Sequence, residues 1–194
     1  MRRATITRTT QETAITISLD LDGTGQVDID TGVGFFDHML SAFGRHGLFD
    51  LAVSCQGDLE VDAHHTVEDV GIVLGDCFAQ ALGSKESITR FAQAMVPMDE
   101  ALMLAAVDIS GRGELFWDVP IEVAQVGTFD TQLGHEFFAG LARNGGFTLH
   151  MREIAGENAH HILEACFKAA GRALRFACEL DARVDGIPST KGSL

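Results

Sequence analysis

The sequence predicts an α+β fold in which one structural unit occurs twice. Segments with alternating apolar residues, typical of strands, are interspersed with segments of helical periodicity. The order of these segments in the first half of the chain is repeated in the second half. A pattern of two adjacent histidines followed by a glutamate also occurs twice, in "AHHTVED" (63–69) and in "AHHILEA" (159–165). Together these observations indicate an internal duplication.

The composition is that of a globular protein. The chain has 194 residues, of which 46% are hydrophobic, so it can bury a core as one compact domain. It contains neither a long apolar run nor the apolar centre of a secretory signal, and we expect a soluble, cytoplasmic protein with four dispersed, buried thiols. The net charge of -14 disfavours nucleic acid and anionic membranes as partners, so the basic contacts to any anionic ligand must be concentrated locally.

The first half of the chain follows a strand and helix order. Apolar residues alternate in "TAITISLDL" (13–21) and again in "QVDID" (26–30), and the intervening "DGTG" predicts a hairpin. Helical spacing in "GFFDHMLSAFGRHG" (34–47) predicts a helix that ends at its last glycine. A strand in "LFDLAVSC" (48–55) follows, and the first histidine pair opens a helix over 64–82.

The second half retraces this order. We expect strands in "EALMLAAVDIS" (100–110) and "ELFWDVPIEVA" (114–124), a helix over 133–146, a strand over 147–154 and a helix over 159–180. The short helices align at an offset of 136 - 38 = 98, and the histidine pairs align at 160 - 64 = 96. The turn before the second pair is therefore two residues shorter.

This alignment divides the chain into three parts. We place the first repeat half at residues 1–90 and the second at 91–184. Residues 185–194 form a polar C-terminal tail without a core pattern. The two halves and the tail are expected to form one compact domain.

The repeated histidine pairs are candidate metal ligands. Successive helical residues point about 100° apart, so His64 and His65 face different directions, and Glu68 can share a face with either one. One helix can then serve two metals, and the second helix carries the equivalent set of His160, His161 and Glu164. Imidazoles and carboxylates without cysteine suit Mn, Fe, Co, Ni or Zn. A single histidine pair at a helix start is more often a cap or polar surface, but its repetition favours metal binding at two sites per chain.

Further motifs resemble those of the imidazoleglycerol-phosphate dehydratase family. They are "RTTQET", "GVGFFDHML", "DAHHTVEDVGI", "DEAL", "DISGR", "GTFDTQL", "GENAHHILEACFKA" and "PSTKGSL", and they span essentially the whole chain. The resemblance implies a duplicated fold with helices sandwiched between two four-stranded sheets. It also implies a homo-oligomer of 24 subunits, with two Mn(II) per subunit bound between neighbouring chains.

The resemblance also implies the metal ligands. One metal would be held by His38, His65, Glu68 and His161. The other would be held by His64, His160, Glu164 and a residue of "GHEFF". The repeat alignment places Glu136 opposite His38 and favours Glu136 as that residue, with His135 as the alternative.

The reaction implied is the dehydration of D-erythro-imidazole glycerol phosphate to imidazole acetol phosphate in histidine biosynthesis. The hydrogen to be removed has no neighbouring carbonyl. If the ring binds as an imidazolate between two metals, it can drive loss of the hydroxyl through a diazafulvene-like intermediate. Candidates for acid and base catalysis are Glu12, Glu164 and Glu68, and matching positions for phosphate binding are Arg90, Arg112, Lys168, Ser189 and Lys191.

One departure and two alternatives remain at this stage. Ala42 occupies a position where many relatives are expected to have glutamine, so a polar contact near the substrate is missing. The ligand set alone also fits a dinuclear metallohydrolase that uses a metal-bound hydroxide. A non-catalytic oligomer held together by interfacial metals is the other alternative.

Overall fold

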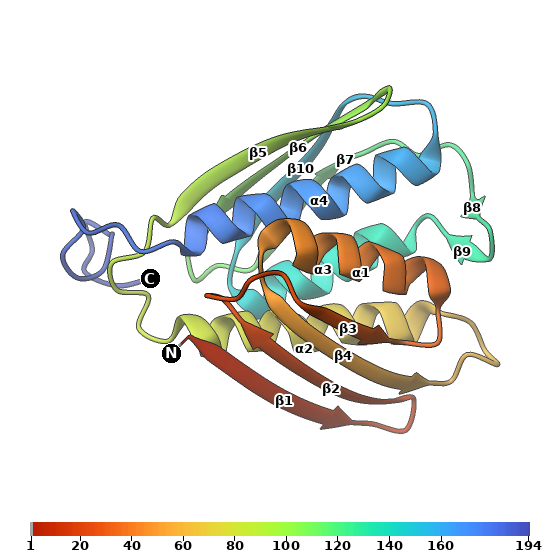
Figure 1. Ribbon diagram of the computed structural model, residues 1–194, viewed down its shortest axis with the longest axis horizontal. Coiled ribbons are helices and arrows are strands. Elements are labelled where there is room, and N and C mark those ends of the chain that lie inside the picture. Colours follow the sequence, from red (N-terminus) through yellow and green to blue (C-terminus); the bar gives the residue numbers. More distant parts are fainter. Residues whose placement is uncertain (1) are drawn as a thin grey trace.

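Two four-stranded sheets enclose a layer of four helices in the computed structural model, which describes residues 2–194 (Figure 1). The first half contains β1 (Arg3–Thr9), β2 (Thr13–Asp20), β3 (Val27–Asp30), α1 (Gly34–Gly47), β4 (Asp50–Gly57) and α2 (His64–Leu82). The second contains β5 (Phe91–Met98), β6 (Ala101–Asp108), β7 (Glu114–Asp118), β8 (Gln125–Val126), β9 (Phe129–Asp130), α3 (Leu133–Gly145), β10 (Thr148–Ala155) and α4 (Ala159–Cys178). The predicted duplicated α+β sandwich is confirmed.

The two sheets have the same topology. Their strand orders are β1-β2-β4-β3 and β5-β6-β10-β7, and in each the last pair is parallel while the others are antiparallel. Val27 pairs with Leu51 as Leu115 pairs with Leu149, which gives offsets of 115 - 27 = 88 and 149 - 51 = 98. The difference of ten residues is an insertion in the second half, which contains the small β8–β9 hairpin.

The predicted hairpin between 13–21 and 26–30 is wrong. Strand β2 instead pairs with β1, which the sequence analysis did not identify, and β4 lies between β2 and β3. The "DGTG" segment is anchored to β4, because the Asp50 carboxylate accepts the backbone N–H groups of Thr24 and Gln26 at 2.8 and 3.0 Å. The segment thereby crosses the end of β4. The second sheet has the same arrangement, in which β10 lies between β6 and β7.

The helix predictions are confirmed. Helix α1 ends at Gly47, and α2 begins at His64, as the periodicity indicated. The four cysteines are free and buried, as expected. Within residues 2–194, no helix is long and apolar enough to cross a membrane. Strand β5 begins at Phe91, but the division of the chain at residues 90 and 184 stays a prediction.

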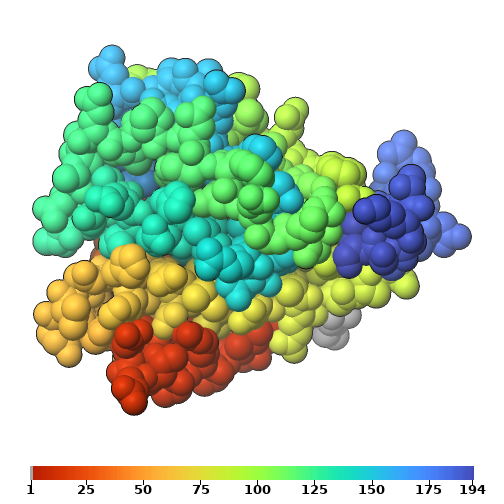
Figure 2. Space-filling model, turned by 180° about the vertical axis from the view of Figure 1, so that it is seen from behind, coloured from red at the N-terminus to blue at the C-terminus, as the bar shows by residue number. Residues whose placement is uncertain are grey.

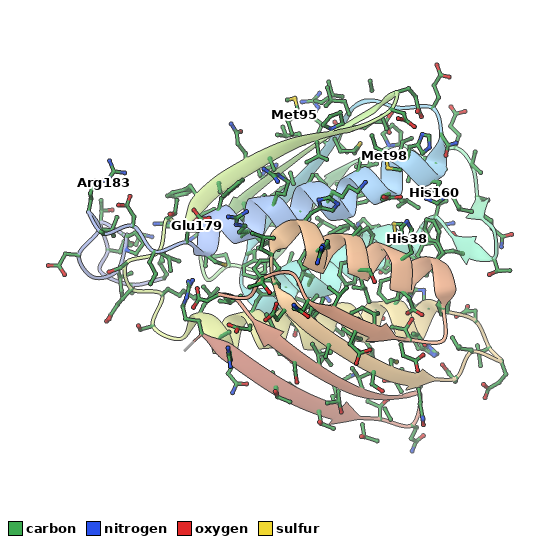
Figure 3. All side chains as sticks on the ribbon, viewed as in Figure 1. His38, Met95, Met98, His160, Glu179 and Arg183 are labelled. Carbon is green, nitrogen blue, oxygen red and sulfur yellow. The ribbon has the colours of Figure 1, made fainter. Side chains whose placement is uncertain are left out.

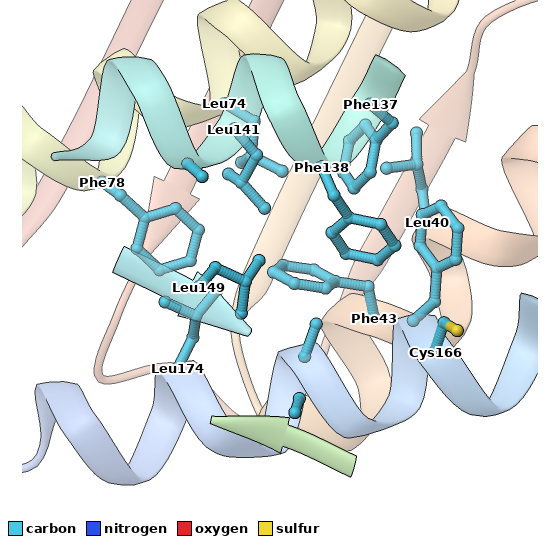
Figure 4. Close-up of a cluster of buried hydrophobic side chains, with 14 of the residues drawn as sticks. Leu40, Phe43, Leu74, Phe78, Phe137, Phe138, Leu141, Leu149, Cys166 and Leu174 are labelled. Atoms are coloured by element: carbon cyan, nitrogen blue, oxygen red, sulfur yellow. The ribbon is translucent and has the colours of Figure 1, made fainter. Parts of the chain in front are cut away.

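The hydrophobic core lies between the sheets and draws on all four helices (Figure 4). Phe43 of α1, Phe78 of α2, Phe137 of α3 and Phe167 of α4 are fully buried. Phe78 packs edge-on against Phe43, and Phe137 stacks on Phe167 at 4.9 Å between ring centroids. Because the rings come from both halves, neither half has a separate core.

The helices pack in pairs that join one half to the other. Helix α4 packs on α1, and α2 packs on α3, so each long helix contacts the short helix of the opposite half. Figure 2 shows the molecule from behind, with α2 in yellow and α3 in teal side by side. A glycine makes each approach possible: a Cβ atom on Gly75 would lie 2.7 Å from the Leu141 carbonyl oxygen, and one on Gly171 would overlap the Phe43 carbonyl oxygen. These glycines are repeat equivalents, since 171 - 75 = 96.

We therefore expect Gly75→Ala and Gly171→Ala each to lower the free energy of unfolding by about 1–3 kcal/mol, because the added methyl group meets backbone that cannot rotate away. Denaturant unfolding monitored by circular dichroism measures the change. Gly34→Ala is the matched control, since a Cβ atom there has no neighbour within 4 Å. Equal stability of the three variants would show that the helix pairs do not depend on close backbone contact.

Candidate metal centre and substrate-binding groups

One cluster of potential metal ligands lies where α1 and α4 meet. Of the described residues 2–194, the only set of three ligand side chains with donor atoms within 4.8 Å of one another is His38, His160 and Glu164. The Glu164 Oε2 atom lies 3.0 Å from His38 Nε2 and 3.1 Å from His160 Nε2. Figure 3 shows His38 on α1 and His160 on α4 at the same end of the helical layer. The cluster therefore joins the two halves of the chain.

Glu164 carries a stable negative charge in this cluster. Its side chain is only 9% exposed, and its other oxygen accepts from Lys168 Nζ at 2.7 Å. Burial opposes ionisation, but hydrogen bonds from Lys168 and His38 more than offset it and lower the pKa of Glu164 to about 2. Glu164 is thus a carboxylate at neutral pH, which is the form that binds a divalent cation.

The second histidine of each pair points to a different set of carboxylates. His65 Nδ1 lies 2.9 Å from Asp58, and His161 Nδ1 lies 2.7 Å from Glu100. These hydrogen bonds raise the pKa of both histidines. On the other side of the His65 ring, Nε2 lies 3.7 Å from Glu12.

The remaining predicted ligands are dispersed along α2 and α3. His64 Nε2 lies 3.7 Å from Glu68 Oε2 on the same helix. Glu136 accepts from its neighbour His135 at 2.9 Å, and both side chains line a small cavity beside Trp117. The choice between His135 and Glu136 as a ligand stays a prediction.

The observed cluster differs from the grouping that the resemblance implied. In that grouping, His38 shares a metal with His65, Glu68 and His161, whereas within one chain it lies beside His160 and Glu164. The repeat offsets relate this cluster to Glu136, His64 and Glu68 on the other helix pair, although these side chains do not form a comparable cluster.

The predicted phosphate-binding groups lie mainly at the opposite end of the molecule. Arg90 binds the Asp108 carboxylate at 2.8 Å and the carbonyl oxygen of Pro188 at 2.7 Å, which holds the tail in place. Arg112 lies 3.7 Å from the same Asp108, and its side chain is largely exposed. The backbone N–H of Arg90 also donates to the carbonyl oxygen of Ala177, near the end of α4. The tail projects from this end in Figure 2.

Ser189 and Lys191 belong to the tail segment itself. The Ser189 hydroxyl accepts the backbone N–H of Lys191 at 3.2 Å, so the two residues form one turn. Lys168 is the exception among the predicted phosphate ligands, because it lies beside Glu164 in the cluster. Burial, together with the positive charges of Lys168 and Arg172, lowers the pKa of His46 on the adjacent α1.

Three comparisons place the chain among known proteins. Residues 31–174 match the family model for imidazoleglycerol-phosphate dehydratase. The chain belongs to the imidazoleglycerol-phosphate dehydratase family. The enzyme from Acidiphilium cryptum is 63% identical over 194 residues, covering 100% of this chain and 99% of that protein. The one from Dinoroseobacter shibae is 59% identical over 195 residues, with 100% of both covered.

Solved structures of the family have the same fold. The Pyrococcus furiosus enzyme superposes with a TM-score of 0.85 at 41% identity, covering 97% of this chain and 100% of that one. The Staphylococcus aureus enzyme superposes with a TM-score of 0.84 at 38% identity, covering 92% and 99%. The chain is therefore a hydro-lyase of the imidazoleglycerol-phosphate dehydratase family, a family of histidine biosynthesis, and the metallohydrolase alternative is set aside.

Sequence reasoning missed several carboxylates that contact the predicted site residues. Asp58, Glu100 and Asp108 contact predicted site residues but occur in turns and strand ends without a recognisable spacing. One signal was available for Glu100, because it lies 100 - 12 = 88 residues after Glu12 and 88 is the offset of the paired strands.

We expect Lys168→Met to lower the stability of the metal-free protein at neutral pH, because Glu164 would keep its burial and lose its cation. The pKa of Glu164 is about 2 in the folded protein and near 4.5 in the unfolded chain, so its ionisation stabilises the folded state at pH values above 4.5. This contribution is lost as the pH falls towards 2. The difference between wild type and variant should therefore shrink as pH falls from about 4.5.

Urea unfolding between pH 7 and pH 3, in the presence of a chelator, measures this effect. Arg172→Met is the control, since it removes the same charge one turn further along α4. A stability difference that does not change with pH would show that Lys168 does not act through Glu164.

Proposed function

We propose that this protein catalyses the Mn(II)-dependent dehydration of D-erythro-imidazole glycerol phosphate to imidazole acetol phosphate, a step of histidine biosynthesis. Membership of the dehydratase family supports the reaction. The observation that carries the metal requirement is the cluster of His38, His160 and Glu164. We further propose a homo-oligomer of 24 chains, two Mn(II) per chain and a cytoplasmic location.

The donor set of the cluster fits a divalent transition metal. Two imidazole nitrogens and one ionised carboxylate oxygen lie within 4.8 Å of one another, and no thiolate is among them. The His38 side chain is 52% exposed, so positions remain open for substrate or for ligands from another chain. When bound, the metal supplies Lewis-acid polarisation of the imidazole ring and fixes the orientation of the ring.

The carboxylates differ in their freedom to move protons. Glu164 is held by His38, His160 and Lys168, so it acts as a ligand and not as a mobile base. The Glu12 side chain is 53% exposed, and its nearest charged partner is His65 at 3.7 Å. Overall, hydroxide leaves the carbon attached to the ring, a proton leaves the adjacent carbon, and the resulting enol becomes the ketone. We assign the proton transfer to Glu12.

The positions of the cationic groups support an assembly. Ala177, whose carbonyl oxygen accepts the backbone N–H of Arg90, lies seventeen positions after His160 on α4, which corresponds to about 26 Å at 1.5 Å per residue. A three-carbon phosphate ester is far shorter. Arg90, Ser189 and Lys191 of one chain therefore cannot bind the phosphate of a substrate whose ring lies at the His38 cluster of that same chain. This separation supports the proposal that a second chain supplies these groups at sites between neighbouring subunits.

Metal removal tests the proposed function directly. Exhaustive chelation should abolish turnover of imidazole glycerol phosphate, because the ring would lose its polarising group, and added Mn(II) should restore it. Product formation is measured with the full-length protein, before and after chelation. Mg²⁺ is the control metal, because it prefers oxygen ligands to imidazole. Undiminished turnover by demonstrably metal-free protein would contradict the mechanism.

Removal of residues 187–194 tests the role of the tail. Loss of the Ser189 and Lys191 contacts to phosphate should reduce kcat/KM by roughly 100-fold or more, since each charge-assisted hydrogen bond contributes about 1.5–3 kcal/mol. The hydrophobic core does not include these residues, and Arg90 keeps Asp108 after it loses the Pro188 carbonyl, so the melting temperature should fall only slightly. A chain lacking only residues 192–194 keeps both side chains and is the control. Equal activity of both shortened chains would exclude a phosphate-binding tail.

A further inference from the structure

We propose that Asp58 and Glu100 are positioning residues that select Nε2 of His65 and of His161 as the metal-binding atom. This inference rests on the proposed metal-dependent function. Neither carboxylate is expected to contact the metal or the substrate. Each acts through the histidine beside it, by holding the opposite nitrogen of the ring.

The hydrogen bonds define the protonated nitrogen. Asp58 Oδ2 lies 2.9 Å from His65 Nδ1, and Glu100 Oε2 lies 2.7 Å from His161 Nδ1. An ionised carboxylate can only accept a hydrogen bond, so Nδ1 must carry the hydrogen in both rings. The lone pair is then on Nε2, which points away from Asp58 or Glu100 and lies 3.7 Å from Glu12 in His65 and 3.8 Å from Asp99 in His161. Metal-binding histidines generally have such a partner, which fixes the ring and increases its basicity.

Glu100 is itself held by the start of α4. Its Oε1 atom accepts the backbone N–H of Asn158 at 2.8 Å and that of Glu157 at 3.4 Å, while Oε2 faces His161. The Asn158 side chain accepts the N–H groups of both His160 and His161 and so caps the helix. One oxygen of the Glu100 carboxylate therefore accepts hydrogen bonds from the backbone, and the other accepts one from the His161 ring. Its orientation is determined by three donors.

Comparison of the two repeats shows how the carboxylates around the second histidine differ between the halves. Glu12 and Glu100 are repeat equivalents in the turns of the β1–β2 and β5–β6 hairpins, since 100 - 12 = 88. Glu100 binds Nδ1 of its histidine, whereas Glu12 lies near Nε2 of His65, on the metal-binding side of the ring. In the first half, Asp58 has taken the position on Nδ1.

The length of the turn explains how Asp58 does this. His64 follows the last residue of β4 by seven positions, but His160 follows the last residue of β10 by only five, since 64 - 57 = 7 and 160 - 155 = 5. Asp62 and Asn158 are equivalent caps, because each accepts the N–H of the first histidine. The two extra residues lie before this cap, in the segment that begins with Asp58. Because Asp58 binds Nδ1 of His65, Glu12 is available for proton transfer. Glu100 instead binds Nδ1 of His161 and orients that ring.

The proposal predicts a specific effect of a carboxamide at position 100. In Glu100→Gln, the two backbone N–H groups should keep the amide oxygen, which turns the amide NH₂ towards His161 Nδ1. An NH₂ group donates, so His161 would place its hydrogen on Nε2 and lose the metal-binding lone pair. Asn at position 58 has no backbone donor to orient it and can still offer its oxygen to His65. Asp58→Asn should therefore have a smaller effect than Asp58→Ala.

The experiment measures Mn(II) affinity and the protonated ring nitrogen. Free Mn(II) is titrated by electron paramagnetic resonance into full-length wild type, Glu100→Gln, Asp58→Asn and Asp58→Ala. Glu100→Gln and Asp58→Ala should bind Mn(II) about 10–100-fold more weakly, and Asp58→Asn less so. Solid-state ¹⁵N NMR of histidine-labelled, metal-free protein should show one ring changing from Nδ1–H to Nε2–H in Glu100→Gln.

Matched controls separate charge and folding from orientation. Glu157→Gln and Glu60→Gln remove one charge from the same two turns without touching a histidine, and they should bind Mn(II) as wild type does. Asp58→Glu should restore affinity, because the longer carboxylate still reaches Nδ1. Should Glu100→Gln fail to fold, the comparison of Asn, Ala and Glu at position 58 decides.

Three results have distinct meanings. Weak Mn(II) binding by the orientation variants, with normal binding by the charge controls, is the expected outcome. Equal affinity of Glu100→Gln and Glu157→Gln, or an unchanged ring nitrogen, would overturn the role of Glu100. Wild type that binds no Mn(II) would overturn the proposed function itself, and with it this inference.

Discussion

The close contact between helices of opposite halves is the constraint on which the site depends. Gly171 allows α4 to lie directly on the backbone of α1, and this contact brings His38 to within 3.0 Å of Glu164. A bulkier residue in this position would separate the helices and with them the imidazole and the carboxylate. Because Gly75 makes the equivalent contact between α2 and α3, the two halves interlock and share one core.

Charge is distributed unevenly in this acidic protein. The chain has a net charge of -14, yet Lys168 lies against Glu164, the one carboxylate of the cluster. Burial, and after it the charges of the same lysine and of Arg172, hold the pKa of His46 below its usual value. A negatively charged chain can therefore place cationic side chains of α4 beside a carboxylate that stays ionised. Such a combination suits a ligand that carries both a metal-binding ring and a phosphate.

The two halves have kept their topology but not their chemistry. The equivalent of His38 is Glu136, the second half carries a ten-residue insertion before α3, and its turn before the histidine pair is two residues shorter. These differences fall at the ends of strands and helices, where a change in length does not disturb the core. They make the surroundings of His65 and His161 unequal: Glu12 lies beside Nε2 of one ring, whereas Glu100 binds Nδ1 of the other.

The sequence by itself determined the helices, their ends and the duplication. Apolar periodicity and glycine are local signals, so the limits of α1 at Gly47 and of α2 at His64 could be predicted from neighbouring residues. The repeated histidine pairs could be recognised for the same reason, and they predict metal binding. Only the tertiary structure decided which strands pair, because β4 inserts between β2 and β3 from a distant part of the chain. It also decided that His38 meets His160 and Glu164. That contact depends on the crossing of two helices, on which His38 and Glu164 are 126 residues apart in the sequence.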